Sequence, residues 1–123
     1  MVRVFYTHWN KDEALRVVGL LRDAGHTVAH HWSTEPDAAS WKTLKENLPD
    51  AMVISLTRLP SHGRHLAEWF WEAKYRRAIP IVFVDGDPEK VAIARKQFPK
   101  AIFAAGDRLA ETLREILAKN PSA

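Results

Sequence analysis

Hydroxyl, imidazole and carboxyl side chains stand at the ends of several apolar segments of the sequence. Ser55 lies within Ile54-Ser55-Leu56, near the end of one such segment. A serine hydroxyl becomes a nucleophile when a neighbouring base removes its proton. The Gly-x-Ser-x-Gly turn that exposes the serine of many hydrolases is absent around this residue. We therefore expect Ser55 to hydrogen-bond locally rather than to attack a substrate.

Histidine is the second group with chemical potential, and the chain has six of them. His62 and His65, three residues apart, could turn two imidazoles toward one point. His8 and Asp85 could complete a ligand set that suits zinc, copper or nickel. The His-Glu-x-x-His spacing of zinc enzymes is missing, and the chain contains no cysteine. The pattern favours loop histidines without a metal, so we expect no cofactor, and a metal or small-molecule sensor stays open as an alternative.

Aromatic residues crowd into one short stretch. Trp69, Phe70, Trp71 and Tyr75 lie within seven residues, too many for one face of a helix. We predict that Phe70 packs inward, whereas Trp71 and Tyr75, four residues apart, form a second face. With Arg76 beside them, these rings have the aromatic and arginine composition of protein interfaces. The alternative is a wide core face on which Trp71 lies half covered.

The secondary-structure elements that could position these groups follow from the alternation of apolar runs with amphipathic stretches. Five strands are predicted, over Val2–Thr7, Thr27–His31, Ala51–Leu56, Pro80–Val84 and Ala101–Phe103. Five helices are predicted, over Lys11–Ala24, Asp37–Leu48, Arg64–Arg77, Asp87–Phe98 and Asp107–Lys119. The fourth helix has a strong start, because Asp87 can cap it and a proline follows at its first position.

This alternation predicts an α/β fold of three layers, a doubly wound five-stranded parallel sheet in the order 2-1-3-4-5, which is flavodoxin-like. The third and fourth strands are continuously apolar, as expected for central strands that helices cover on both faces. Function is expected where strands one and three end, near Thr7, His8 and Ser55, with Asp85 after the fourth strand. No dinucleotide fingerprint and no phosphate-binding loop motif occurs in the sequence.

Length and composition limit the class of protein. The 123 residues fit one domain over residues 1–119, with a frayed tail from Asn120 to Ala123. No run approaches the ~20 apolar residues of a membrane helix, and the chain is expected to be soluble and cytoplasmic. A net charge of +3 is weak support for nucleic-acid binding, because 15 acidic residues are interspersed with 18 basic ones.

The segment from Pro49 to Gly63 combines an apolar run with a loop punctuated by proline and glycine. Together with the run from Ile79 to Val84, it resembles the corresponding segments of response-regulator receiver domains, and the general pattern extends over essentially the whole chain. Receivers carry an acidic pair after strand one, an acceptor aspartate at the end of strand three, a Ser or Thr after strand four and a lysine after strand five. The resemblance places at those positions, in the same order, Thr7 and His8, Ser55, Asp85, and Ala105.

Each departure from the receiver pattern removes a piece of chemistry. Without the acidic pair and the acceptor, the hard oxygen ligands for Mg²⁺ are missing. Without the lysine, no cation neutralises an acyl phosphate, and Asp85 would repel it. The resemblance therefore implies a degenerate receiver, or pseudo-receiver. We expect a non-phosphorylatable signalling or regulatory domain of bacterial type that acts by protein–protein interaction with a partner protein or with its own twin.

An enzyme is the competing hypothesis. The TIR domains and the nucleoside deoxyribosyltransferases have a similar layout and a catalytic glutamate early in a helix after a central strand. The opening from Arg3 to His8, followed by Lys11-Asp12, faintly resembles a TIR domain, and Glu68 or Glu72 could supply the glutamate. Such a carboxylate would have to lie partly desolvated beside a bound glycoside. The alternative is a solvated glutamate on an amphipathic helix, which is where most glutamates lie.

Overall fold

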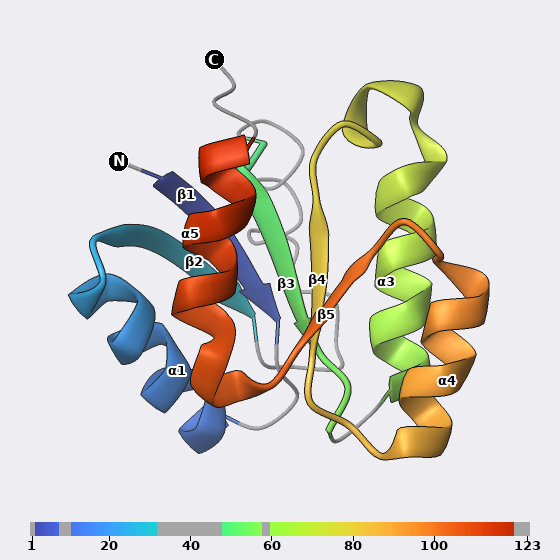
Figure 1. Ribbon diagram of the computed structural model, residues 1–123, viewed down its shortest axis with the longest axis horizontal. Coiled ribbons are helices and arrows are strands. Elements are labelled where there is room, and N and C mark those ends of the chain that lie inside the picture. Colours follow the sequence, from blue (N-terminus) through green and yellow to red (C-terminus); the bar gives the residue numbers. More distant parts are fainter. Residues whose placement is uncertain (1, 8–10, 32–47, 58–59, 120–123) are drawn as a thin grey trace.

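The computed structural model describes residues 2–7, 11–31, 48–57 and 60–119, and its centre is one parallel sheet (Figure 1). Its strands are β1 (Val2–Thr7), β2 (His26–His31), β3 (Ala51–Ser55), β4 (Ile81–Val84) and β5 (Ile102–Ala104). Their order is β2-β1-β3-β4-β5, and every neighbouring pair is parallel. The predicted three-layer, doubly wound architecture and its strand order are thus confirmed.

Helices cover both faces of the sheet, α1 and α5 on one side and α3 and α4 on the other (Figure 1). Their bounds are α1 (Lys11–Asp23), α3 (Pro60–Glu72), α4 (Pro88–Gln97) and α5 (Leu109–Lys119). In the described part of the chain two short 3₁₀ helices accompany them, η1 (Lys74–Arg76) after α3 and η2 (Gly106–Arg108) before α5.

Two apolar clusters, one on each face of the sheet, make up the core. Val4, Tyr6 and Val53 pack against α1 and α5 on one face, whereas Phe5 and Ile54 pack against α3 on the other. This alternation is the two-residue period of a strand that is buried on both faces. All residues of β3 and β4 are buried, as their continuously apolar sequences predict. The side chains of β5 are only half-buried, which fits its place at the sheet edge.

Helix α3 begins at Pro60, four residues before the predicted start at Arg64. Proline suits the first turn of a helix because it needs no amide partner there. Gly63, read from the sequence as a loop residue, is buried within the helix. A Cβ at this position would come within 2.8 Å of the Ile54 side chain. The glycine therefore lets α3 approach β3 closely, rather than marking a loop.

The end of α3 also differs from the prediction. The α-helix stops at Glu72, and Ala73 adopts an extended conformation (φ −81°, ψ 131°) before η1. Trp71 and Tyr75 thus belong to different helices, so the predicted second aromatic face on one helix is wrong. The extended residue redirects the chain, and Tyr75 is displayed from η1 instead.

The remaining boundaries lie within one or two residues of the prediction wherever the structure describes them. Asp87 does occupy the cap position of α4, but its side chain makes no capping hydrogen bond within the described chain. Most of the helix predicted over Asp37–Leu48, and the tail from Asn120, lie outside the described residues. Leu48, at the end of that prediction, is not helical. Among the helices in the described part of the chain, none is long and apolar enough to cross a membrane.

Candidate functional site

The ends of β1 and β3 carry hydroxyl groups, and no acidic residue occurs in residues 1–10 or 51–63 of the sequence. Thr7 and Ser55 are both buried. In the pairing of β1 with β3, Thr7 lies opposite Ile54 and therefore belongs to the face covered by α3. Ser55, one residue later, belongs to the face covered by α1 and α5. The sheet thus brings the two residues to one edge but directs their hydroxyls to opposite faces.

Ser55 is engaged in a local turn, as the sequence led us to expect. Its Oγ lies 2.9 Å from Oγ1 of Thr57 and accepts a hydrogen bond from the Thr57 amide at 3.3 Å. The next residue, Leu56, is buried, and its amide donates to the carbonyl of Val84 at 3.0 Å. The hydroxyl of Thr7 is fully buried and has no hydrogen-bond partner among the described residues. The end of β3 therefore offers hydroxyls and an aliphatic side chain rather than a carboxylate.

Asp85 supplies the carboxylate that follows β4. Its backbone is left-handed (φ 57°), and so is that of Gly86 (φ 101°). The amide of Asp85 donates to the carbonyl of Ala104 at 3.1 Å, and its Oδ1 accepts a hydrogen bond from the Gly106 amide at 2.8 Å. A Cβ on Gly106 would come within 2.8 Å of Oδ2, so a glycine allows this close approach. Asp85 thus ties the end of β4 to the turn after β5.

Tyr6 is a buried neighbour of this carboxylate that the sequence interpretation did not single out as a site residue. Burial raises the pKa of its phenol well above the ordinary value, and the negative charges of Asp85 and Glu13 raise that pKa further. Arg16 opposes this effect. The two-residue alternation along β1, which places Tyr6 on the face of Val4, is the signal that could have identified it.

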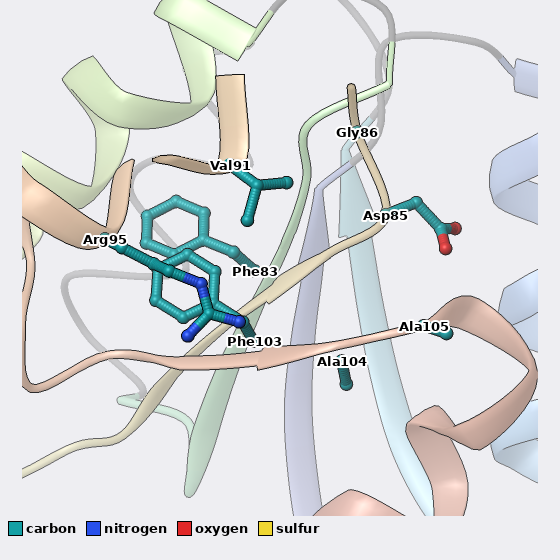
Figure 2. Close-up of a pocket in the computed structure, with 8 residues that line it drawn as sticks. All are labelled: Phe83, Asp85, Gly86, Val91, Arg95, Phe103, Ala104 and Ala105. Atoms are coloured by element: carbon teal, nitrogen blue, oxygen red, sulfur yellow. The ribbon is translucent and has the colours of Figure 1, made fainter. Parts of the chain in front are cut away.

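A cleft of about 350 Å³ opens beside the end of β5 (Figure 2). It is lined by Phe83, Asp85, Gly86, Val91, Arg95, Phe103, Ala104 and Ala105. Ala105, placed by the resemblance where a receiver has its lysine, is exposed at this cleft. Because alanine is small and uncharged, this position leaves open space where a lysine would introduce a positive charge.

The aromatic floor of the cleft is a stack of rings from neighbouring strands. The ring centroids of Phe83 and Phe103 lie 5.3 Å apart, with an angle of 20° between the planes. The guanidinium carbon of Arg95 lies 4.5 Å from the centroid of the Phe103 ring. In Figure 2 the arginine reaches across that ring from α4, whereas the carboxylate of Asp85 turns away from it.

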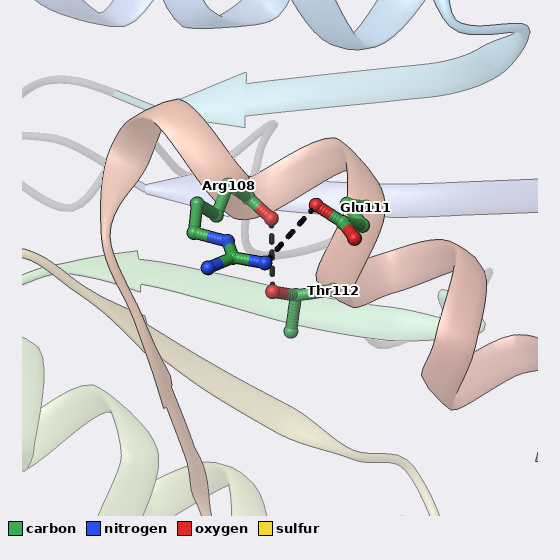
Figure 3. Close-up of polar contacts among 3 residues, drawn as sticks. All are labelled: Arg108, Glu111 and Thr112. Carbon is green, nitrogen blue, oxygen red and sulfur yellow. Dashed lines mark hydrogen bonds and ion pairs between the residues drawn. The ribbon is translucent and has the colours of Figure 1, made fainter.

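A second hollow, of about 300 Å³, lies on the α5 side of β5. At its rim Arg108 Nη2 lies 3.4 Å from Glu111 Oε2, and Thr112 Oγ1 donates to the Arg108 carbonyl at 2.8 Å (Figure 3). Both charged side chains are more than half exposed, so this ion pair contributes little to stability. These contacts hold the first turn of α5 together.

The histidine hypothesis concerns residues that are only partly described. His8 and the side chain of His62 lie outside the described residues, and His65 is exposed on α3. Within the described part of the chain, no group of three potential metal ligands occurs. The metal site therefore stays an untested alternative.

Glu68 is exposed on α3, and its Oε2 accepts a weak hydrogen bond from Gln97 Nε2 at 3.4 Å. It does not line either of the clefts beside β5. The environment of Glu68 gives no support to the enzyme hypothesis, which stays a prediction.

Arg76 and Arg77 cap the C-terminal end of α3. Arg76 donates from Nε to the Phe70 carbonyl at 2.7 Å and from Nη2 to the Trp69 carbonyl at 3.1 Å. Arg77 donates from Nε to the Trp71 carbonyl at 2.7 Å and from Nη2 to the Glu72 carbonyl at 3.2 Å. The last four carbonyls of a helix have no partner within it. Here two consecutive arginines satisfy all four.

The residues of the predicted interface have different environments. Trp71 is half-buried, contacts Phe98 edge-on at 6.1 Å, and donates from Nε1 to the Ile79 carbonyl at 3.0 Å. Arg76 is buried, with its guanidinium 4.6 Å from the Trp69 ring and a donor 3.1 Å from the Tyr75 hydroxyl. Tyr75 itself is 63% exposed. Trp71 and Arg76 thus build a supported base from which Tyr75 projects.

Comparison with known proteins gives similarity in structure only. No protein-family model and no curated protein sequence matches the chain. A protein assigned as a response regulator from Chloroflexus aurantiacus is similar over 95% of this chain and 98% of its own, with 20% identity and a TM-score of 0.76. The signal receiver domain of a histidine kinase from Syntrophus aciditrophicus is similar over 97% and 92%, with 17% identity and a TM-score of 0.74.

A designed protein with a Rossmann 2x3 fold is also similar, over 99% of this chain and 94% of its own, with 14% identity and a TM-score of 0.68. Since a protein without natural function superposes nearly as well, similarity at this level of identity establishes architecture and not activity. The chain has the fold of response-regulator receiver domains.

Proposed function

We propose that this protein is a non-phosphorylatable, receiver-like regulatory domain of the cytoplasm that acts by binding another protein or a second copy of itself. The observation that carries the proposal is the absence of acidic residues from the sequence at the ends of β1 and β3, where Thr7 and Ser55 stand instead. A hydroxyl of ordinary acidity neither accepts a phosphoryl group readily without an activating base nor holds Mg²⁺ as a carboxylate does.

Asp85 does not replace the missing carboxylates in this proposal. Its Oδ1 is occupied by the Gly106 amide, and its backbone is fixed by a further hydrogen bond to Ala104. A phosphoryl group beside it would meet the negative charge of this carboxylate. The neighbouring Tyr6 stays a neutral phenol and adds no anion. This arrangement supports a role in which the carboxyl-end edge of the sheet is structural.

The surface proposed for recognition centres on Tyr75. Tyrosine is enriched among the residues that dominate binding energy at interfaces, because it combines a large apolar ring with a hydroxyl. The ring projects from η1, whose position is fixed by the buried guanidinium of Arg76 and by the packing of Trp71. A side chain held on a rigid base loses little conformational entropy on binding.

The loss of phosphorylation is tested by intact-mass measurement after incubation with a small phosphodonor and Mg²⁺, alongside a receiver domain that is known to accept phosphate. We expect the mass of this protein to stay unchanged while the control gains a phosphoryl group. A stable adduct on any residue of the edge formed by the strand ends would refute the proposal.

The recognition surface is tested by sedimentation of the wild-type protein and of Tyr75→Ala. If the partner is a second copy, the wild type sediments as a dimer and the variant as a monomer. Leu20→Ala is a matched control, because Leu20 is also more than half exposed but lies on α1. A dimer that survives Tyr75→Ala but dissociates in Leu20→Ala would place the interface elsewhere.

A further inference from the structure

The cleft between α4 and β5 has the features of a small ligand site that is separate from the proposed recognition surface. Its volume of about 350 Å³ is at the lower end of the range of small-molecule pockets. One wall is α4, which contributes Val91 and Arg95, four residues apart and hence on one helical face. The other wall is the end of β5, from Phe103 to Ala105. The lining combines apolar side chains with two charged ones, Arg95 and Asp85, and a few polar groups among apolar residues are typical of sites that orient a small amphipathic molecule.

Arg95 provides the polar anchor of this cleft. Its guanidinium rests 4.5 Å from the Phe103 ring centroid, and no hydrogen bond or ion pair of this group is found with any described residue. A guanidinium carries five donors in a planar fork that matches the two oxygens of a carboxylate. Because the Phe103 ring supports the arginine, part of the conformational entropy that a free arginine would lose on binding is already lost.

The aromatic rings determine which kind of anion suits the cleft. Phe103 is stacked on the buried Phe83, which also contacts Phe98 with a centroid distance of 5.6 Å, so the half-exposed Phe103 ring is held in a fixed position. A flat ring can lie against the exposed side of the Arg95 guanidinium and reach the edge of Phe103, whereas a puckered ring cannot lie flat against the guanidinium. A planar aromatic molecule that carries a carboxylate satisfies both the floor and the anchor.

Charge and space in the rest of the cleft are compatible with such a ligand. Among the described residues that line it, Asp85 alone is acidic, and its carboxylate points away from the rings toward Gly106. Ala105 is exposed and small, so the end of the cleft beside it stays open. From these features we propose that the cleft between α4 and β5 binds a small planar aromatic carboxylate, with Arg95 pairing its carboxylate and Phe103 contacting its ring.

The test is an NMR titration of the full chain with two probes of nearly equal shape, indole-3-acetate and its neutral amide, indole-3-acetamide. We expect saturable shifts of the backbone amides of Val91, Phe103 and Ala105 with the acid at millimolar concentration. Indole-3-acetamide should bind about tenfold more weakly than indole-3-acetate, because it lacks the charge that pairs with Arg95. Cyclohexanecarboxylate, which has the charge but no flat ring, should also bind more weakly than the indole acid.

Three variants make the result specific. Arg95→Gln should lower the affinity for indole-3-acetate about tenfold and leave the affinity for indole-3-acetamide nearly unchanged, because only the ionic contact is lost. Ala105→Leu should reduce the affinity for both probes by filling the cleft. Arg108→Gln is the control, since Arg108 is also exposed but lies on the α5 side of β5. It should bind both probes as the wild type does.

Several results would overturn the proposal. One is the absence of saturable shifts at the cleft, and another is equal affinity of the wild type for indole-3-acetate and indole-3-acetamide. A third is an equal loss of affinity for indole-3-acetate in Arg95→Gln and Arg108→Gln. Arg95 is exposed, so its variant should keep a folded spectrum, and the proposal can be decided even if Ala105→Leu does not fold. The outcome can be distinguished from those of the phosphorylation and sedimentation experiments, because neither of them measures the binding of a carboxylate to Arg95.

Discussion

The carboxylate of Asp85 accepts a hydrogen bond from the backbone amide of Gly106, with Oδ1 2.8 Å from the nitrogen. This contact joins the turn after β4 to the turn after β5, and it engages one oxygen of the Asp85 carboxylate. Asp85 also adopts a left-handed backbone conformation, which aspartate tolerates better than most residues. Its side chain therefore has a structural use that does not require a metal or a phosphate.

Substitutions of Asp85 separate the contribution of its hydrogen bond to Gly106 from that of its left-handed backbone. Asp85→Asn keeps an acceptor oxygen and tolerates the left-handed backbone, so the free energy of unfolding should change by less than about 1 kcal/mol. Asp85→Ala loses the acceptor and strains the backbone at φ 57°, and should cost about 2–3 kcal/mol. Urea unfolding measures both. Equal losses in the two variants would show that the contact with Gly106 contributes nothing specific.

The pH dependence of stability should report on Tyr6. Its pKa in the folded protein is raised above the ordinary value of 10.0, chiefly by burial. Below pH 10 the phenol is neutral in both states, so its contribution is fully present. Above pH 10 the unfolded chain releases the proton and the folded chain does not, so stability should fall as pH rises.

Tyr6→Phe is the matched comparison for this effect, because phenylalanine does not ionise. The stability advantage of the wild type over Tyr6→Phe should shrink as the pH rises above about 10. Chemical denaturation at a series of pH values measures the difference between the two proteins. A difference that stays constant from about pH 9 to about pH 11 would contradict the environment described for Tyr6.

The two arginines that cap α3 should differ in their importance. Arg76 is buried and bonds two carbonyls, so Arg76→Met leaves two partly buried acceptors unpaired and should cost about 2–4 kcal/mol. Arg77 makes two similar bonds at an exposed position, where water can replace it, so Arg77→Met should cost about 0.5–1 kcal/mol. Urea unfolding compares them. The account of this cap fails if Arg77→Met is the more damaging substitution.

Two glycines should respond to alanine in opposite directions. Gly86 has φ 101°, and a Cβ there would come within 2.7 Å of the Leu56 Cβ, so Gly86→Ala should destabilise the fold by at least about 2 kcal/mol. Gly19 lies within α1, where an alanine methyl would have no described atom within 4 Å, and Gly19→Ala should stabilise by about 0.5–1 kcal/mol. Thermal unfolding of each variant shows whether its stability has risen or fallen. A stabilising Gly86→Ala would mean that the turn after β4 is more open than described.

Much of the fold could be predicted from the sequence because its signals are local. The apolar runs that became β3 and β4 can be read from consecutive residues, and the face of α1 formed by Ala14, Val18 and Leu21 from residues three and four positions apart. The start of α3 was misplaced because Pro60 and Gly63 are loop signals by composition. Their actual roles, a first-turn proline and a close contact with β3, depend on the tertiary structure.

The candidate site was less predictable, because its contacts join residues that are distant in the sequence. Asp85 and Gly106 are 21 residues apart, and no local pattern pairs them. Tyr6 gains its character from burial and from charges on α1 and after β4. The absence of acidic residues at the ends of β1 and β3, in contrast, could be read directly from the sequence, since it needs only the strand positions.

The central claim of the proposal is that the ends of β1 and β3, where the sequence has no acidic residue, leave Asp85 without the partner carboxylates that would hold a divalent cation. The most direct measurement is a Mg²⁺ titration followed by the NMR signals of the amides of Thr7, Ser55 and Asp85, because it does not depend on the choice of phosphodonor. We predict no saturable shift at these amides at millimolar Mg²⁺. A saturable shift that is centred there and disappears in Asp85→Asn would contradict the account.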